Sequence, residues 1–424
     1  MLRPDLVGFV ALSFLVPAAS AQTNDDKPNG YDRPIVITGV RISELKDTLS
    51  KCLARKCPPD QDIAASTALA EQEFVEGKYQ DARATLKASL SRNKNYAKDY
   101  PEPVANLFRA DSRIAAHMGA GDEYSTETFG VVSALKAGLP NDDPRVLAAE
   151  IEVGDMFARM GQIDAAVQKY HALADRASKV NQPNIEGMAR LRVVALYAQV
   201  ASQNRQNYVA YAVEARDAAI RLAKDHDPRM KDFAAAANLL VTRLAAKNGD
   251  KAAVDRLVAA YVAAGAGAGA RPVALYSPPM KGIDAVYDGS IPAPVWSKIN
   301  SGELIGQWAD ISYWVKPDGT VDDVDVLRGG VGALTGPRKV NPTFDEVWTL
   351  PIIQQIKGRR YAPLPGDRNG PGLLRVERYT LTAWLADGVG PSGKGSRIQT
   401  SSAPRFEMLD LSVDPPLATS APGK

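Results

Sequence analysis

The spacing of apolar positions divides the 424-residue chain into two parts. From Ile63 to Ala264 the chain is rich in alanine and leucine, and its apolar residues recur with helical spacing and without strand-like alternation. After Gln307 the period changes to about two residues, which is typical of strands with one buried face. The pattern predicts a helical domain over residues 63–263, followed by an α+β domain over residues 293–412.

A short motif recurs along the helical part. It consists of an aromatic residue, a glycine soon after it, a β-branched or aromatic residue, an alanine, and an apolar residue one turn further on. The glycine permits a tight turn between antiparallel helices, and the alanine lets their backbones approach. The copies are Phe74, Gly77, Tyr79, Ala82 and Leu86; then Phe157, Gly161, Ile163, Ala166 and Tyr170; and, less completely, Gly249, Val254, Val258 and Tyr261.

This motif resembles the tetratricopeptide repeat, whose period is about 34 residues. The copies are not tandem and lack that family's tryptophan, so the resemblance implies an irregular α-solenoid. The concave face of such a solenoid commonly holds a peptide or another protein. The alternative is that loops of the chain itself fill the groove.

The C-terminal part begins with an expected β-hairpin. Apolar and polar residues alternate on both sides of a Pro-Asp-Gly turn at residues 317–319. A short helix with Pro351 in its first turn and Gly358 at its end comes next, followed by a strand from Leu373 to Trp384. The order strand, strand, helix, strand predicts a small antiparallel sheet with a helix packed on one face.

These segments resemble the C-terminal domain of TonB. Residues 309–328 look like that family's hairpin, residues 351–363 like its helix and exit segment, and residues 374–381 like its last strand. The chain departs from the family at Arg359, where a tryptophan is usual, and in an insertion over residues 329–341. Without the anchored N-terminal helix and Pro-rich spacer of the family's energy transducers, we do not expect energy transduction.

TonB-like domains bind partners by strand addition, so the resemblance implies a peptide-binding edge. We expect Ile311–Val315 to be the edge strand, with further contacts from the exit segment and the last strand. The predicted protein-binding residues are Ile311, Tyr313, Val315, Arg359, Arg360, Tyr361, Pro363, Arg375, Tyr379 and Leu381. Residues 34–39, Pro-Ile-Val-Ile-Thr-Gly, resemble the box that TonB-dependent receptors offer to TonB. They are expected either to pair with this domain, in the same chain or a neighbouring copy, or to form an ordinary strand or arm.

The first 21 residues have the pattern of a secretory signal. Arg3 precedes an apolar run from Leu6 to Val16, and Ala19-Ser20-Ala21 is a small-x-small cleavage pattern. The run is shorter than the roughly 20 residues that cross a bilayer, so we expect cleavage and export to a bacterial periplasm. The alternative is an uncleaved anchor.

Three further segments complete the predicted organisation. Residues 22–62 are expected to form an N-terminal arm, residues 264–292 a Gly/Ala/Pro linker, and residues 413–424 a disordered tail. The arm contains Cys52 and Cys57. We expect a disulfide between them in an oxidising compartment, with a helix ending between the two cysteines, and two free thiols as the alternative.

Composition argues against several kinds of chemistry. Fifty-one basic and forty-nine acidic residues leave a net charge of +2, so no nucleic-acid partner is expected. His117, His171 and His226 are widely separated and are expected to pack or lie on helix surfaces. Phosphate-loop, dinucleotide and nucleophile-elbow motifs are missing from the sequence. We expect no catalytic residue, no metal and no cofactor.

These observations predict a non-enzymatic periplasmic scaffold without a transmembrane anchor. Its expected partners are envelope proteins or an extended peptide strand, bound through the helical repeats and the TonB-like domain. The alternative is a TonB-type transport accessory that acts on outer-membrane receptors. The sequence leaves the oligomeric state open.

Overall fold

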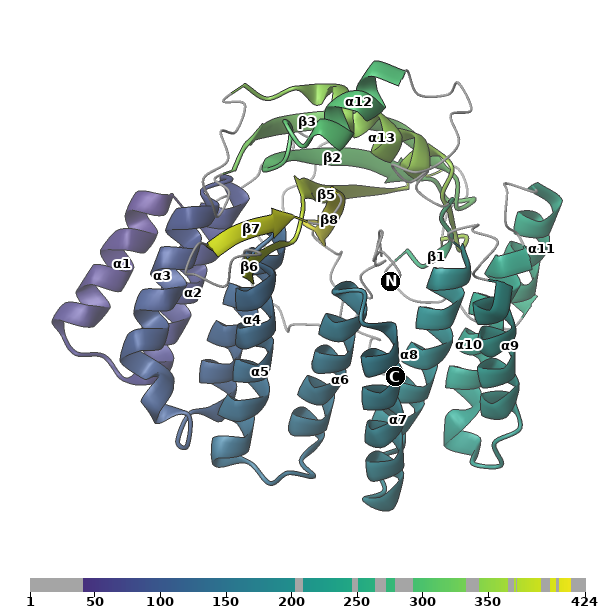
Figure 1. Cartoon of the computed structure of the whole chain (residues 1–424), viewed down its shortest axis with the longest axis horizontal. Coiled ribbons are helices and arrows are strands. Elements are labelled where there is room, and N and C mark those ends of the chain that lie inside the picture. Colours follow the sequence, from purple (N-terminus) through teal and green to yellow (C-terminus); the bar gives the residue numbers. More distant parts are fainter. Residues whose placement is uncertain are drawn as a thin grey trace, which may run out of the picture.

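The computed structural model describes residues 41–202, 209–245, 251–263, 272–278, 293–332, 343–364, 370, 372–389, 397–401 and 404–412. A helical part is followed by small antiparallel sheets, as the change of period predicts. The helices stand side by side in a row, and the largest sheet lies across one set of their ends (Figure 1).

In the helical part, each helix packs on the next one along the chain. The helices are α1 (Ile42–Ala54), α2 (Pro59–Val75), α3 (Tyr79–Asn93), α4 (Pro101–His117), α5 (Gly121–Gly138), α6 (Pro144–Arg159), α7 (Ile163–Lys179), α8 (Pro183–Ser202), α9 (Val209–Ala223), α10 (Lys231–Ala245) and α11 (Lys251–Ala263), with short 3-10 helices η1 (Lys94–Tyr96) and η3 (Pro228–Met230).

Glycines with positive φ make three of the turns between these helices. Gly77 follows α2 with a φ of +78°, and Gly161 follows α6 with a φ of +75°, a region that favours glycine. Both turns confirm the repeat motif. Gly119, with a φ of +71°, makes the same turn after α4. The motif did not reveal this copy because alanines stand where it requires an aromatic residue.

The small residues of the motif also pack as predicted. Ala82 and Ala166 are fully buried where neighbouring helices meet. A Cβ atom on Gly154 would lie 2.3 Å from the ring of Tyr170, so only glycine fits there without a shift of the ring. Gly249, in the incomplete third copy, lies outside the described residues.

The helical part begins earlier than the sequence predicts. Residues 42–54, within the predicted N-terminal arm, form α1, which packs against α2. Most side chains of α1 are exposed, but Ile42, Leu45 and Leu49 are half-buried along one side of the helix and Cys52 on the same side is buried. Residues 1–40, with the signal pattern and the segment at 34–39, lie outside the described part of the chain.

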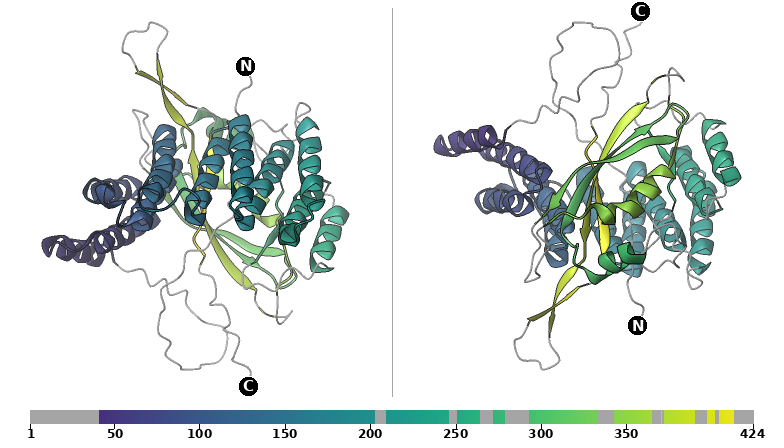
Figure 2. Two further views of the ribbon diagram at one scale, coloured as in Figure 1. Left: turned by 90° about the horizontal axis from the view of Figure 1, so that it is seen from below. Right: turned by 90° about the horizontal axis from the view of Figure 1, so that it is seen from above.

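The C-terminal part contains one sheet of four antiparallel strands in the order β3-β2-β5-β8. Its strands are β2 (Gln307–Val315), β3 (Val321–Val331), β5 (Leu373–Thr382) and β8 (Arg405–Asp410). The other elements are β1 (Ala274–Tyr276), α12 (Ala293–Ser301), η4 (Glu346–Thr349), α13 (Leu350–Lys357), β4 (Arg360–Tyr361), β6 (Leu385–Val389) and β7 (Arg397–Ser401). β1 pairs with β4, and the β6–β7 hairpin projects from the body of the molecule (Figure 2).

Strand, strand, helix and strand follow in the predicted order as β2, β3, α13 and β5. Trp348, Ile352 and Ile356 are fully buried and form a core with apolar residues of β2 and β5 on one face of the sheet. The fourth strand, β8, was not predicted. It is short, and it mixes charged and apolar residues, a pattern equally typical of a surface loop.

Candidate protein-interaction site

β2, the expected edge strand, lies in the interior of the sheet. β3 pairs with it on one side and β5 on the other, and Ile311, Tyr313 and Val315 are fully buried. Its backbone therefore has no free side for an incoming peptide. The expected edge is wrong because alternation shows which side chains share a face but not where a strand stands in the sheet.

Four other predicted residues do not share a common contact. Arg360 faces Asp255 of α11 at 3.6 Å, and Arg375 forms an ion pair with Asp410 of β8. Pro363 is half-buried, and Leu381 is fully buried.

The remaining predicted residues meet in a buried polar cluster. Arg359 Nη1 lies 2.9 Å from both carboxylate oxygens of Glu377, and Arg359 Nη2 donates to the Tyr379 hydroxyl at 2.7 Å. Tyr313 donates to Glu377 Oε1 at 2.7 Å, and its hydroxyl lies 2.8 Å from that of Tyr361. Glu377 is the central acceptor. It was missed because it looks like an ordinary polar position of an alternating strand.

Burial fixes the charge states in this cluster. It raises the pKa of Tyr313 and Tyr379 well above the ordinary value, and the Glu377 carboxylate raises the pKa of both further. Burial acts to lower the pKa of Arg359, but Tyr379 and Glu377 outweigh it and the pKa is raised. The tyrosines are therefore neutral donors around one ion pair. The cluster holds the end of α13 on the sheet.

The opposite face of the sheet packs on three turns of the helical part, which follow α2, α4 and α6. At the first turn, Arg378 of β5 donates to the carbonyl oxygens of Phe74 at 2.5 Å and Val75 at 2.6 Å. Its guanidinium also bonds Asp310 of β2 at 2.6 Å and lies 4.0 Å from the Trp308 ring centroid. A cation here satisfies the free carbonyls at the C-terminal end of α2.

The second turn, after α4, contacts the middle of β5. The Thr380 hydroxyl lies 2.9 Å from His117 Nδ1 and 3.1 Å from the Tyr79 hydroxyl. Burial lowers the pKa of His117 to about 4, so its ring is neutral near pH 7. His117 also packs edge-on against Phe74, which confirms the packing role expected of this histidine.

The third turn, after α6, is held by residues around β8. Arg405 and Trp384 donate to the carbonyl oxygen of Arg159 at 3.0 and 3.3 Å. The Arg159 side chain pairs with Glu407 of β8 at 2.9 Å. The Trp384 ring stacks on Tyr124 of α5, with centroids 5.4 Å apart.

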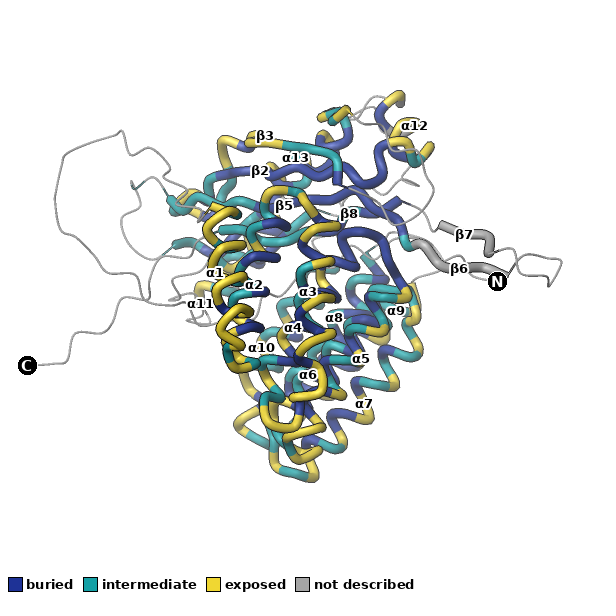
Figure 3. The backbone as a smooth tube through the Cα atoms, turned by 90° about the vertical axis from the view of Figure 1, so that its left-hand side faces the viewer, coloured by how far each residue is buried: buried dark blue, intermediate teal, exposed yellow. Residues whose placement is uncertain are grey.

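A fourth contact lies near the far end of the row. Arg243 of α10 donates to the carbonyl oxygen of Ala274 in β1, and Leu275 and Tyr276 pack with Leu257 of α11. β1 therefore forms a strand within the segment predicted to be a linker. The two parts are joined by extensive buried contacts between described residues, which two domains separated by a linker alone would lack. The sheet lies on the helix ends (Figure 3).

Among the described strands, the sheet has two edges, β3 and β8. β3 exposes Asp322, Asp323 and Asp325, and Asp323 has a φ of +47° beside register shifts against β2. Charge and irregularity of this kind block strand addition. β8 pairs with β5 on one side, and no described strand pairs with it on the other. The β8 edge is therefore the candidate site for an extended partner.

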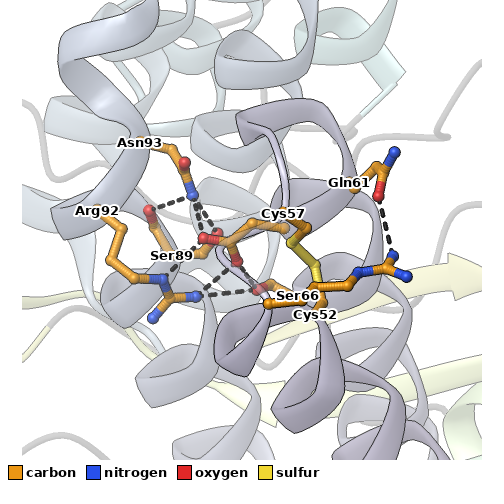
Figure 4. The surroundings of a disulfide bond; sticks show 9 residues. Cys52, Cys57, Gln61, Ser66, Ser89, Arg92 and Asn93 are labelled. Carbon is orange, nitrogen blue, oxygen red and sulfur yellow. Dashed lines mark hydrogen bonds and ion pairs between the residues drawn. A yellow bond between two sulfur atoms is a disulfide. The ribbon is translucent and has the colours of Figure 1, made fainter.

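The predicted disulfide joins Cys52 and Cys57, whose Cα atoms are 5.2 Å apart (Figure 4). α1 ends at Ala54, between the two cysteines as predicted, and Lys56 adopts a φ of +53°. Beside the bridge, Asp62 of α2 accepts hydrogen bonds from α3, including two from Arg92 at 2.7 and 2.8 Å. The bridge and this network fix the corner between α1, α2 and α3.

The described residues contain no group of three or more histidine, cysteine, aspartate or glutamate side chains that could hold a metal ion. The described helices are too short or too polar to cross a bilayer.

No protein-family model and no curated protein matches the chain. Among solved structures, the chain is similar to nearly identical TPR-like repeats of a Podosopora anserina protein named as a kinesin light chain. The identity is 15%, over 43% of this chain and 88% of that one, with a TM-score of 0.33. A single-residue variant of that protein has the same identity and TM-score and is covered over 87% of its length.

Proposed function

We propose that this protein is a non-enzymatic scaffold that binds an extended segment of a partner protein as an additional strand along β8. The observation that carries the proposal is the side of β8 along which no described strand pairs, in a sheet whose two faces are both covered. An added strand gains affinity from main-chain hydrogen bonds and specificity from alternate side chains.

The backbone of β8 is oriented for such pairing. Leu411 just after β8 donates to the carbonyl oxygen of Val376, and alternation then directs the Leu409 and Glu407 amides toward β5. The amides of Met408 and Phe406 point to the open side.

The surfaces beside this edge favour apolar partner residues. Phe406 stacks on Trp348, with ring centroids 6.0 Å apart, and Met408 packs on the same core. On the other face, Leu409 packs against the helical core. A partner with apolar residues at alternating positions would extend both layers.

The proposed location is the bacterial periplasm, with envelope proteins as partners. The signal pattern over residues 1–21 and the Cys52–Cys57 bridge support an oxidising compartment. The element order of β2, β3, α13 and β5 supports the TonB-like assignment. The neutral tyrosines around Arg359 include no activated nucleophile, which favours binding over catalysis.

The test measures binding of a library of extended peptides to the full chain and to two β8 variants. Met408→Pro removes an amide on the open side without removing a bond to β5, and Met408→Leu retains that amide. We expect selected peptides to bind the wild type and Met408→Leu but not Met408→Pro. Peptides N-methylated on the amides that pair with β8 should also fail. Equal binding by both variants would refute strand addition at β8.

A further inference from the structure

Two carboxylates lie together inside the helical part, away from the sheet edge. Asp111 of α4 is fully buried, and the half-buried Glu127 of the neighbouring helix α5 lies level with it across the α4–α5 hairpin, six residues after Gly121 as Asp111 lies six before His117. Arg83 of α3 donates to Asp111 Oδ1 at 3.0 Å. The pair therefore sits where three consecutive helices meet.

The hydrogen bonds around Asp111 are incomplete unless Glu127 carries a proton. Asp111 Oδ2 is buried and receives no hydrogen bond from an amide, guanidinium or hydroxyl group of the described residues. The Glu127 carboxyl acts on Asp111 from α5, and it donates a hydrogen bond only when protonated. Two adjacent carboxylates in a buried site share one proton because both cannot ionise without strong repulsion.

We propose that Asp111 and Glu127 form a proton-dependent lock between α4 and α5. In the locked state the Glu127 carboxyl donates to Asp111 Oδ2. Loss of that proton leaves two facing carboxylates, removes the hydrogen bond and weakens the packing of α4 on α5.

The surrounding charges compensate this repulsion only in part. From α3, Arg83 and Lys87 favour ionisation of Glu127, but burial and the charge of Asp111 outweigh them and raise the pKa of Glu127 to about 7. Glu123, one turn earlier on α5, adds a negative charge 3.6 Å from Arg83. The stabilisation by the lock is therefore fully present below about pH 4.5 and is lost as the pH rises to about 7, where Glu127 gives up its proton.

The lock lies close to the contact between α4 and strand β5 of the sheet. Asp111 lies on α4 less than two turns before His117, which contacts Thr380 of β5. In the turn that follows, a Cβ on Gly119 would lie 2.1 Å from the carbonyl oxygen of Ala383, so the backbones touch there. A shift of α4 is thus transmitted to β5 at the second turn.

Hydrogen exchange of the full chain between pH 5.5 and 8.5, corrected for intrinsic rates, tests the lock. We expect protection of α4 and α5 to fall as the pH rises from 5.5 to 7, by up to about tenfold per pH unit, and to level off above about pH 7.5, while α7 stays constant. Glu127→Gln retains a donor at every pH and should abolish the decrease. Glu123→Gln, the matched control, should keep it.

Wild-type profiles that are the same for α4, α5 and α7 would overturn the lock, as would an unchanged pH dependence in Glu127→Gln. A carbon-13 titration of the Glu127 carboxyl in the wild type provides a readout that does not depend on folding of a variant. A midpoint near pH 7 supports the lock, and a midpoint near 4.5 refutes it.

Discussion

Arg378 of β5 donates a hydrogen bond to the carbonyl oxygen of Phe74 in the last turn of α2, across 304 positions of sequence. The same guanidinium pairs with Asp310 and lies over Trp308, and its side chain is fully buried. At the boundary between the two parts, the Arg378 side chain therefore donates to the free carbonyl at the end of α2 and pairs with Asp310. It also covers the Trp308 ring.

Replacement of Arg378 should destabilise both parts together. Arg378→Met leaves two helix carbonyls without donors and removes one partner of the buried Asp310, which we expect to cost about 3 kcal/mol. Urea unfolding measured separately by tryptophan fluorescence and by helical circular dichroism is the check. Arg328→Gln is the control, because Arg328 bonds Asp310 and Val75 from a more exposed position and should cost less than about 1 kcal/mol. Equal costs would contradict this role of Arg378.

The bridge between Cys52 and Cys57 should stabilise the corner that holds α1. Closing so short a loop contributes about 2 kcal/mol in the chain-entropy description, so Cys52→Ser with Cys57→Ser should lower the unfolding free energy by about that amount. Thermal unfolding with and without dithiothreitol separates the bridge from lost packing. The reductant should lower the wild-type Tm and leave the double variant unchanged. A wild-type Tm that does not respond would show that the bridge is not formed.

The sequence predicted the elements of this fold better than their arrangement. Gly77 and Ala82 specify a helix turn locally, and the Pro-Asp-Gly turn specifies a hairpin, because each signal depends on a few neighbouring residues. The place of β2 inside the sheet depends on β5, which begins 58 positions after β2 ends (373 against 315), and nothing in the alternation of β2 records that partner.

The candidate site was predictable only in part for the same reason. Arg359 and Arg378 both look like solvated basic positions in the sequence, yet both are buried. Arg359 depends on three tyrosines from other strands and on Glu377, and Arg378 depends on a helix end far away in the chain. Long-range partners of this kind decide whether an arginine is exposed, and periodicity does not reveal them.

Gly77 should tolerate no side chain, for two independent reasons. Its φ is +78°, and an added Cβ would lie 2.4 Å from the indole nitrogen of Trp308. Because backbone strain and overpacking act together, Gly77→Ala should lower the free energy of unfolding by at least about 2 kcal/mol. Gly161→Ala is the matched control, because Gly161 has a φ of +75° but does not lie against Trp308. Urea unfolding should show the smaller loss for Gly161→Ala, and an equal loss would assign the whole effect to the backbone.

His117 should make the protein sensitive to acid. Burial lowers its pKa from 6.5 to about 4 in the folded chain, so the unfolded chain binds a proton there first. The contribution of neutral His117 is therefore fully present above about pH 6.5 and is lost as the pH falls to 4, by up to about 3 kcal/mol. His117→Gln removes this titration and can still bond Thr380. The free energy of unfolding measured between pH 4 and 7.5 should fall more steeply with acid in the wild type than in His117→Gln. The exposed His226→Gln variant should follow the wild type. Parallel curves for all three proteins would mean that the pKa of His117 is the same in the folded and the unfolded chain, and would contradict the effect of burial on its ring.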